Sequence, residues 1–329
     1  MKAKSIYGGS SEQIKKALHA AMADHFKPTL AIAFISIKQD RHGICEVLKK
    51  EGIAVFGATS CGEFTESHQS EGESVIMLLE IDPKYFTILM EDLKGNELQE
   101  ISKNLAKKAL KKFKDPGFIL CTNGMSVDNI ILDGNLIIRS IEEVIGPHAN
   151  ITGGMAGDDW MLKSSYIFTH DFETNLGIGA LVFDQEKVSL QGMAISGWKP
   201  IGISRTITKC EGTYLHTIDD KPALDMYLKY LGASYDDNQE KYHLFENVAQ
   251  HYPFLVERES GASMMATPMM VDKESKALIC DVSLRQGSKL SFTMPPDFDF
   301  VEEVLDKARE LKKTSNSSGE ALLIFSCAG

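Results

Sequence analysis

The stretch Leu30-Ala31-Ile32-Ala33-Phe34-Ile35-Ser36-Ile37 decides the fold, because it is almost wholly apolar and shows no alternation with polar residues. Such a run is typical of a strand buried on both faces of a sheet. Asp40–Glu51 follows with its apolar residues at helical spacing, and Ile53–Thr59 is a second continuous apolar run. The order strand, helix, strand predicts a β-α-β unit with two parallel strands.

The residues around this unit extend it on both sides. Ser11–Asp24 has the apolar spacing of a helix, and the second strand runs into the turn Ser60-Cys61-Gly62-Glu63. Ser74–Glu80 and Tyr85–Met90 predict two further strands, and Asp82-Pro83 between them predicts the turn of a hairpin. A parallel pair and a hairpin together predict a mixed sheet.

The same order of elements recurs in the next part of the chain. The recurring elements are predicted helices over Glu97–Lys112 and Asp128–Ile145, buried strands over Gly117–Thr122 and Ala149–Gly153, and a strand pair over Leu176–Phe183 and Val188–Ser196. We therefore interpret this domain as an internal duplication of β-α-β plus hairpin units, with pseudo-repeats over about 1–95 and 96–197.

Each pseudo-repeat has a glycine-rich, acidic turn after its last buried strand. The first is Gly57-Ala58-Thr59-Ser60-Cys61-Gly62-Glu63, and the second is Gly153-Gly154-Met155-Ala156-Gly157-Asp158-Asp159. Glycines at a strand end allow positive φ or a close approach to a ligand. Carboxylates there can cap a turn, hold a cation or accept from an ammonium group. The duplication predicts that the two turns face each other as half-sites.

A different pattern begins after Gly197-Trp198-Lys199-Pro200-Ile201-Gly202. Ser204–Cys210 and Thr213–Ile218 predict a hairpin, and Ala223–Leu231 predicts a helix that ends at Gly232. The remaining predicted elements are helices over Leu244–Gln250 and Phe298–Lys312 and strands over Phe254–Arg258, Pro268–Val271, Ala277–Cys280, Lys289–Met294 and Ala321–Ser326. We therefore predict an α/β protein of two domains with mixed sheets, 1–220 and 221–329. Because the last strand stands at the very end, we expect the second domain to be incomplete there.

Composition excludes several classes of protein. The net charge of −11 over 329 residues argues against a nucleic-acid surface, which needs a basic face. The N-terminus lacks the apolar region of a signal peptide, and every apolar run is too short to span a bilayer. The six cysteines have no zinc-site spacing, so we expect no metal. Several of them lie in apolar runs, so we expect reduced thiols. We predict a cytoplasmic protein without membrane insertion.

The candidate ligand-binding residues are Ser60, Cys61, Gly62, Glu63, Gly153, Gly154, Asp158, Asp159 and Arg258. For Asp158, Asp159 and Glu63 the alternatives are capping of a turn or anchoring of an ammonium group or hydrated cation. Cys61 has no histidine nearby in the sequence to activate it as a nucleophile. We therefore predict no catalytic residues.

An amino-acid ligand would also need a clamp for its carboxylate, and arginine binds carboxylates bidentately. The candidates are Arg205, Arg258 and Arg285. Arg258 is preferred because it ends the apolar strand Phe254-Leu255-Val256, although a salt bridge with a neighbouring acid is the alternative.

Signatures of common enzymes are absent from the sequence, which has no Walker A loop, no G-x-S-x-G and no strand-linked G-x-G-x-x-G. The nine histidines show no metal-ligand spacing. His170, His216, His243 and His251 could each be an axial haem ligand or an ordinary surface or core residue. We predict a protein that is not an enzyme and has no cofactor.

Five stretches carry a family resemblance. They are Phe56-Gly57-Ala58-Thr59-Ser60-Cys61-Gly62-Glu63, Thr152-Gly153-Gly154-Met155-Ala156-Gly157-Asp158-Asp159, Gly197-Trp198-Lys199-Pro200-Ile201-Gly202, Asp219-Asp220-Lys221-Pro222-Ala223-Leu224 and Phe325-Ser326-Cys327-Ala328-Gly329. In this order they resemble the FIST domain family of intracellular sensory proteins over nearly the whole chain.

The resemblance implies a FIST N domain followed by a FIST C domain, and a natural chain that continues beyond the last strand. It also implies a sensor of small molecules in signal transduction, with amino acids as suggested ligands. A histidine kinase is a possible partner. The alternative that the resemblance implies is a haem-binding nitric-oxide sensor that regulates such a kinase.

Overall fold

The computed structural model describes residues 1–128, 130–161, 163–233, 249–258, 263–297, 299–314 and 319–327. The chain folds as a mixed α/β protein and divides into two compact units. The first unit comprises Met1–Gly192 and Thr314–Ser326, and the second comprises Met193–Lys313 together with Cys327. Among the described residues no helix has the length and apolar character that crossing a bilayer requires.

The first sheet of the first unit contains the predicted β-α-β unit. Its elements are β1 (Lys2–Gly8), α1 (Ser11–Met22), β2 (Leu30–Ser36), α2 (Arg41–Lys50), β3 (Ala54–Ser60) and β6 (Ser74–Glu80), and its strand order begins β1-β6-β2-β3. β2 and β3 are parallel, as predicted, whereas β1 and β2 both run antiparallel to β6. The short strands β4 (Glu63–Phe64) and β5 (Gln69–Ser70) form a separate hairpin.

The second sheet repeats this topology. Its elements are β7 (Phe86–Asp92), α3 (Leu98–Lys112), β8 (Pro116–Asn123), α4 (Gly134–Ile145), β9 (Asn150–Ala156) and β12 (Gly177–Asp184), in the strand order β7-β12-β8-β9. β8 and β9 are parallel, and β12 is antiparallel to both of its neighbours. The two sheets therefore share strand order and direction, while descent from one duplicated unit stays a prediction.

A hairpin from the second half of the unit completes the first sheet. It consists of β10 (Ile167–Phe168) and β11 (Glu173–Thr174), and β10 pairs with β3. The Phe168 ring lies so close to β3 that a Cβ at Gly57 would be only 2.4 Å from it. The two halves are therefore interlocked rather than merely adjacent.

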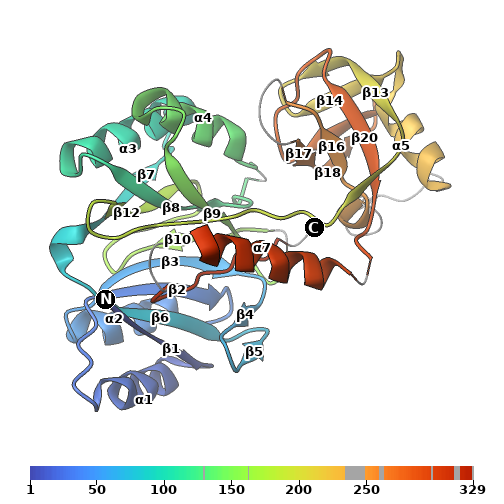
Figure 1. The fold of residues 1–329 in the computed structure, drawn as a ribbon. Coiled ribbons are helices and arrows are strands. Elements are labelled where there is room, and N and C mark those ends of the chain that lie inside the picture. The colour runs from blue at the N-terminus through green and yellow to red at the C-terminus, as the bar shows by residue number, and fades with distance from the viewer. Residues whose placement is uncertain are drawn as a thin grey trace. The chain divides into compact units, whose positions relative to one another are not determined.

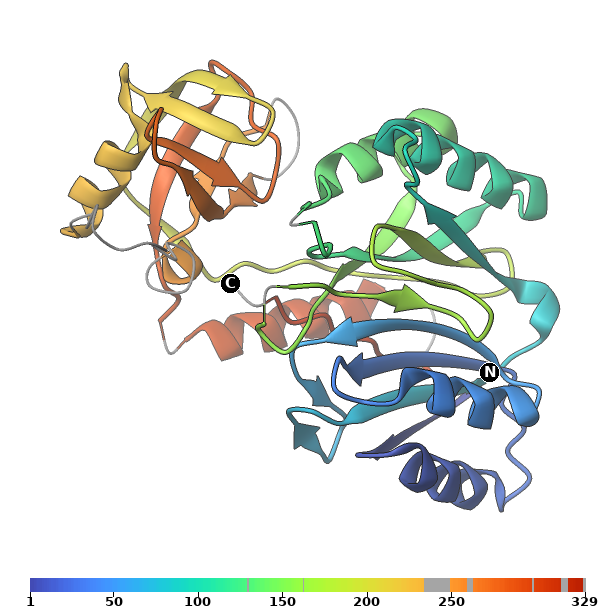
Figure 2. The same cartoon turned by 180° about the vertical axis from the view of Figure 1, so that it is seen from behind.

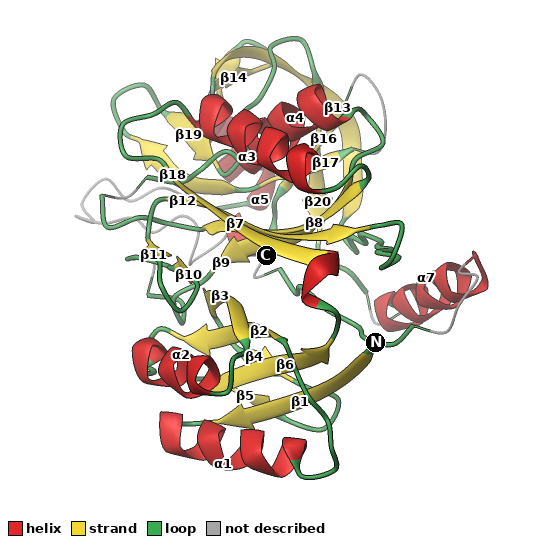
Figure 3. Cartoon of the chain, turned by 90° about the vertical axis from the view of Figure 1, so that its left-hand side faces the viewer, coloured by secondary structure: helices red, strands yellow, loops and turns green. Residues whose placement is uncertain are grey.

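The two sheets face each other, and a pair of helices covers the outer face of each, as Figures 1 and 3 show. Ile32 and Phe56 point into the core between the sheets, whereas Ala31 and Val55 point toward α1 and α2. Both faces of the central strands are thus buried, which explains why their sequences show no polar alternation. Each such large apolar side chain contributes roughly 1.5–3 kcal/mol by its burial.

The predicted hairpin over Ser74–Glu80 and Tyr85–Met90 is wrong. β6 belongs to the first sheet, and β7 pairs with β12 in the second. Between them Asp82 accepts from the Lys84 amide and caps a 3-10 turn over Pro83–Tyr85, which leads the chain from one sheet to the other. The structural repeats therefore begin at β1 and β7.

Two further predicted strands are absent from the described residues. The segment over Val188–Ser196 carries no strand, and Val188 and Leu190 instead pack against the core between the sheets. Residues 321–327 likewise carry no strand, although one was predicted over Ala321–Ser326. In the second segment Leu323 and Phe325 contact the same core, so both segments are attached through a few side chains and not through a strand ladder.

The second unit is built on an antiparallel sheet, in yellow to orange in Figure 2, in the order β17-β16-β20-β13-β14-β19-β18. Its elements are β13 (Lys199–Glu211), β14 (Tyr214–Ile218), β15 (Lys221–Pro222), α5 (Ala223–Leu231), η2 (Ala249–His251), β16 (Phe254–Val256), β17 (Met264–Ala266), β18 (Pro268–Asp272), β19 (Ala277–Cys280), β20 (Lys289–Met294) and α7 (Phe300–Thr314). The predicted hairpin and the helix end at Gly232 are confirmed. The predicted helix over Leu244–Gln250 lies largely outside the described residues.

Candidate functional site

The candidate site lies where β2, β3 and β9 end. Because β2 and β3 are parallel neighbours, their last residues Ser36 and Ser60 lie opposite each other at one edge of the sheet. The chain leaving β9 reaches the same edge, where the Gly157 amide donates to the Thr59 carbonyl (2.9 Å) and the Asp159 amide donates to the Ser60 carbonyl (3.1 Å). The two glycine-acid turns are therefore in direct contact.

Asp159 links the two halves of the unit through its side chain. Its carboxylate accepts from Ser36 Oγ at 2.7 Å and lies 3.1 Å from Lys38 Nζ. The Asp159 side chain is 7% exposed, whereas Lys38 is 63% exposed. An enclosed carboxylate thus has a solvent-exposed lysine as its counter-ion.

Glu63 is the second acid at this edge of the sheet, and we call Glu63 and Asp159 the acid cluster. Glu63 is only 2% exposed. Ser60 Oγ donates to one of its oxygens at 2.7 Å, and the Glu73 amide donates to the other at 3.3 Å. Burial raises the pKa of Glu63. The two hydrogen bonds lower that pKa, and the nearby charge of Asp159 raises it further.

Asp158 holds the loop that follows it. Its carboxylate, in a residue 5% exposed, accepts from the amides of Lys163 at 2.7 Å and Ser164 at 3.0 Å. These bonds are the capping interaction that the sequence left open as one alternative for Asp158. The neighbouring acids Asp158 and Asp159 therefore make different contacts.

Backbone strain marks the turn between these acids and the exposed Trp160. Asp159 and Trp160 have φ values of 53° and 63°, and the turn is closed by the Met161 amide donating to the Asp158 carbonyl at 3.1 Å. A non-glycine residue in this region costs roughly 1–3 kcal/mol, and such strain is concentrated at functional sites. The turn brings the Asp159 carboxylate to Ser36 and leaves Trp160 46% exposed.

Cys61 and two of the candidate glycines, Gly153 and Gly154, lie in closely packed positions, as does Gly157. A Cβ at Gly157 would lie 2.3 Å from Cys61 Sγ, so this glycine lets the two turns meet. Gly153 and Gly154 lie inside β9, and Gly153 has a φ of 142° beside the Leu120 carbonyl. Gly62 is exposed in the β3–β4 turn. Only Gly62 of the candidate glycines therefore lies in a turn of the cluster.

The candidate arginines lie in the second unit. Arg258 follows β16 and is exposed, and Arg205 forms an ion pair with Asp219 at 3.2 Å. Arg285 also lies in that unit and has an interaction partner. The structure thus brings together the predicted Ser60, Cys61, Glu63 and Asp159 within the first unit, without a predicted arginine from the same unit.

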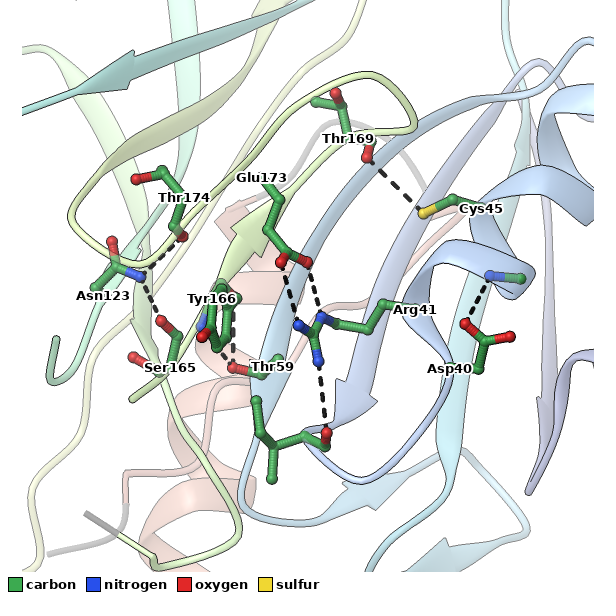
Figure 4. A network of polar contacts seen from close by, with 12 residues as sticks. Asp40, Arg41, Cys45, Thr59, Asn123, Ser165, Tyr166, Thr169, Glu173 and Thr174 are labelled. Carbon is green, nitrogen blue, oxygen red and sulfur yellow. Dashed lines mark hydrogen bonds and ion pairs between the residues drawn. The ribbon is translucent and has the colours of Figure 1, made fainter. Parts of the chain in front are cut away.

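An arginine that the sequence reasoning missed clamps the neighbouring elements together (Figure 4). Arg41, at the start of α2, donates to both oxygens of Glu173 on β11, at 2.9 and 3.2 Å. Its guanidinium lies 4.6 Å from the centre of the Tyr166 ring. It also donates to the Ile37 carbonyl at 3.4 Å, and this contact fixes the loop that carries Lys38.

The corresponding end of the second parallel pair is filled by Asn123 (Figure 4). Asn123 is the last residue of β8, as Ser36 is of β2, and it is fully buried. Its amide nitrogen donates to the carbonyls of Ser165 (2.7 Å) and Thr174 (3.2 Å), and its oxygen accepts from the Gly177 amide (2.7 Å). The end of the β8–β9 pair therefore supports the β10–β11 hairpin, whereas Glu63 and Asp159 lie at the end of the β2–β3 pair.

Three of the four candidate histidines lie among the described residues. His170 pairs with Asp171 at 3.0 Å, His216 stacks near Tyr214, and His251 is exposed; His243 lies outside the described residues. Within the described ranges, no group of three or more His, Cys, Asp or Glu side chains is arranged to hold a metal ion. The haem alternative stays a prediction.

The sequence reasoning also missed Ser36 and Lys38. A usable signal existed, because the predicted parallel pair places the end of one strand beside the end of the next. Reading the residues at both strand ends would have placed Ser36 opposite Ser60. The contact of Lys38 with Asp159 depends on the approach of β9 from the other sheet and has no local signal.

Comparison with known families agrees with the family resemblance of the sequence. Residues 29–221 match the FIST N domain and residues 223–329 match the FIST C domain. A search of curated proteins found no match. Because the two domain matches follow each other and cover most of the sequence, the chain belongs to the FIST family, whose domains are sensory domains of signal transduction.

Proposed function

We propose that this chain senses a small polar ligand with an ammonium group, such as an amino acid, at the cluster of Glu63 and Asp159. The observation that carries the proposal is the meeting of the two acidic turns, which places both carboxylates in one enclosed cluster. An enclosed carboxylate favours a cationic partner. Lys38 supplies that cation and is exposed enough to be displaced by a ligand.

The neighbouring groups suit such a ligand. Ser36 and Ser60 supply hydroxyls that donate to the two acids and can rebond to ligand oxygens or nitrogens. Arg258, in the second unit, is the proposed clamp for a ligand carboxylate. A ligand-induced shift between conformations would report occupancy to a signalling partner in the cytoplasm, such as a histidine kinase.

A thermal-shift screen with amino acids and related amines tests this proposal. A ligand at about 100 times its Kd stabilises the folded state by about 2.7 kcal/mol, which is readily visible as a raised unfolding midpoint. The same screen with Asp159→Asn should lose the shift, whereas Asp171→Asn, which changes an exposed aspartate in the same unit, should keep it. No ligand in the panel, or an unchanged shift in Asp159→Asn, would refute the proposal.

Arg258→Ala tests the proposed carboxylate clamp separately from the proposed ammonium site. The variant should weaken ligands that carry a carboxylate and leave simple amines unaffected, because only the former use the guanidinium fork. Unchanged affinity of Arg258→Ala for ligands that carry a carboxylate, relative to the wild-type protein, would remove the clamp from the mechanism but leave the acid cluster in place.

A further inference from the structure

The return segment, which we define as Glu320–Ser326, follows α7 of the second unit yet belongs to the first compact unit. Its burial alternates like that of a strand. Leu323 and Phe325 pack against the core between the two sheets, whereas Leu322 is 73% and Ile324 is 55% exposed. Since residues 321–327 carry no strand, side-chain packing and the ion pair between Glu320 and the N-terminal amine of Met1 (3.2 Å) hold this segment in place.

Phe325 is the main anchor of the return segment. Its ring meets the Phe34 ring edge to face, with the centroids 5.7 Å apart. The ring also lies against the backbone of β9, where a Cβ at Gly154 would be 3.3 Å from it. Phe325 thus contacts β2 of the first sheet and β9 of the second.

These two strands lead to Asp159, one of the two acids of the cluster, and to its partner Ser36. Phe34 lies two residues before Ser36 on β2, and Gly154 lies on β9, which leads into Gly157 and Asp159. The hydrogen bond from Ser36 to Asp159 ties the end of β2 to the chain leaving β9. A change at this hydrogen bond therefore acts on β2 and β9. The same two strands form the surface against which the Phe325 ring packs, which we call its seat.

We propose that the seat on β2 and β9 is a reversible docking surface for the return segment, and that docking is coupled to the Ser36–Asp159 contact. A ligand that replaces the partners of Asp159 would change the docking of Phe325, and the chain would carry this change to α7. Coupling between two such sites is reciprocal, so either one can be perturbed to read the other. The inference rests on the proposed function only for the identity of the ligand.

Thiol labelling tests the docking without any ligand. Leu323→Cys and Ile324→Cys are compared in the full chain carrying Cys327→Ser, and the labelled peptides are identified by mass spectrometry. Position 323 should label about tenfold more slowly than position 324, because packing shields the former. Adding Phe325→Ala should remove most of this difference. Equal labelling at the two positions, or no effect of Phe325→Ala, would overturn the docking surface.

Ser36→Ala tests the coupling in the same background, with Asp159→Ala, which removes the acceptor of the Ser36 hydroxyl, as a second, independent perturbation. Each should raise the labelling rate of Leu323→Cys about threefold or more, the size of effect seen for coupled positions, and leave Ile324→Cys unchanged. Unchanged rates at position 323 in both variants would overturn the coupling. Because no ligand is used, these outcomes are independent of whether the amino-acid screen succeeds.

Discussion

The carboxyl group of Glu63 is almost completely enclosed, and this enclosure determines how it titrates. Burial raises the pKa of Glu63 above its ordinary value of 4.5, against the opposing effect of its hydrogen bonds from Ser60 and the Glu73 amide. The folded protein therefore holds a proton on Glu63 at pH values where the unfolded chain has lost it. The resulting stabilisation is complete at low pH and is lost as the pH rises through the folded-state pKa.

Glu63→Gln should remove this dependence on pH. Relative to the variant, the wild-type protein should lose free energy of unfolding as the pH rises above about 4.5, by about 1.4 kcal/mol for each unit between the folded and unfolded pKa values. Urea unfolding of both proteins at a series of pH values measures this difference. Parallel pH profiles for the two proteins would show that Glu63 has the same pKa in both states.

Asp158 and Asp159 should respond differently to substitution, because one holds backbone amides and the other faces Ser36 and Lys38. Asp158→Ala should lower the free energy of unfolding by about 1–2 kcal/mol, since two amides lose their acceptor. Asp159→Asn should change it by less than about 1 kcal/mol, because asparagine tolerates positive φ and can still accept from Ser36. Chemical denaturation provides both values, and the reverse order would exchange the roles assigned to these residues.

At the scale of elements, α2 is tied to the β10–β11 hairpin by two ion pairs of different burial. The side chains of Arg41 and Glu173 are 15% and 24% exposed, whereas those of Lys49 and Asp171 are 45% and 67% exposed. Arg41→Ala should cost about 2–3 kcal/mol of unfolding free energy, because it leaves an enclosed carboxylate without its partner.

The exposed pair is the matched control for this prediction. Lys49→Ala should cost less than about 1 kcal/mol, as is usual for pairs in contact with solvent. A double-mutant cycle of Arg41→Ala with Glu173→Gln, measured by urea unfolding, isolates the interaction. Equal losses for Arg41→Ala and Lys49→Ala would mean that the clamp does not depend on burial.

Strand β9 contains a position where only glycine fits. Gly153 has a φ of 142°, and a Cβ there would lie 1.9 Å from the Leu120 carbonyl oxygen on β8. Gly153→Ala should therefore lower the free energy of unfolding by more than about 3 kcal/mol or prevent folding. Gly134→Ala, in an open position at the start of α4, should be neutral or slightly stabilising by the same measurement. Normal stability of Gly153→Ala would contradict the close approach of β9 to β8.

The sequence predicted the positions of the strands better than it predicted which strands pair. The continuous apolar runs identified β2 and β3 and their parallel pairing, because both strand faces are buried. The predicted hairpin pairs β6 with the following strand because the two are close in the chain, but the sheet that a strand joins is a tertiary property. β1 was missed because its lysines, Lys2 and Lys4, interrupt the apolar pattern at the edge of the sheet.

For the site, too, tertiary contacts could not be predicted from the sequence. The sequence identified both acidic turns, and Glu63 and Asp159 do lie in one cluster. It could not separate the contacts of Asp158 from those of Asp159, since these depend on the positive φ of the turn between them. The contact of Lys38 with Asp159 was likewise out of reach, because it joins residues from different sheets.

At the scale of the whole molecule, the proposed function gives different roles to the two compact units. The acid cluster is complete within the first compact unit, and the FIST N domain match includes all of its residues. The second unit corresponds largely to the FIST C domain match and contains Arg258. We therefore expect the first unit to supply recognition of the ammonium group and the second to add specificity for a carboxylate.

The central claim is that the cluster binds an ammonium group in the place that Lys38 Nζ occupies. Titration calorimetry of the best amine ligand from the screen tests it most directly, with Lys38→Met and Asp159→Asn compared with the wild-type protein. Removing the internal cation should tighten binding, and removing the carboxylate charge should weaken it about tenfold or more, equivalent to about 1.4 kcal/mol. Weaker binding to Lys38→Met together with unchanged binding to Asp159→Asn would contradict the claim.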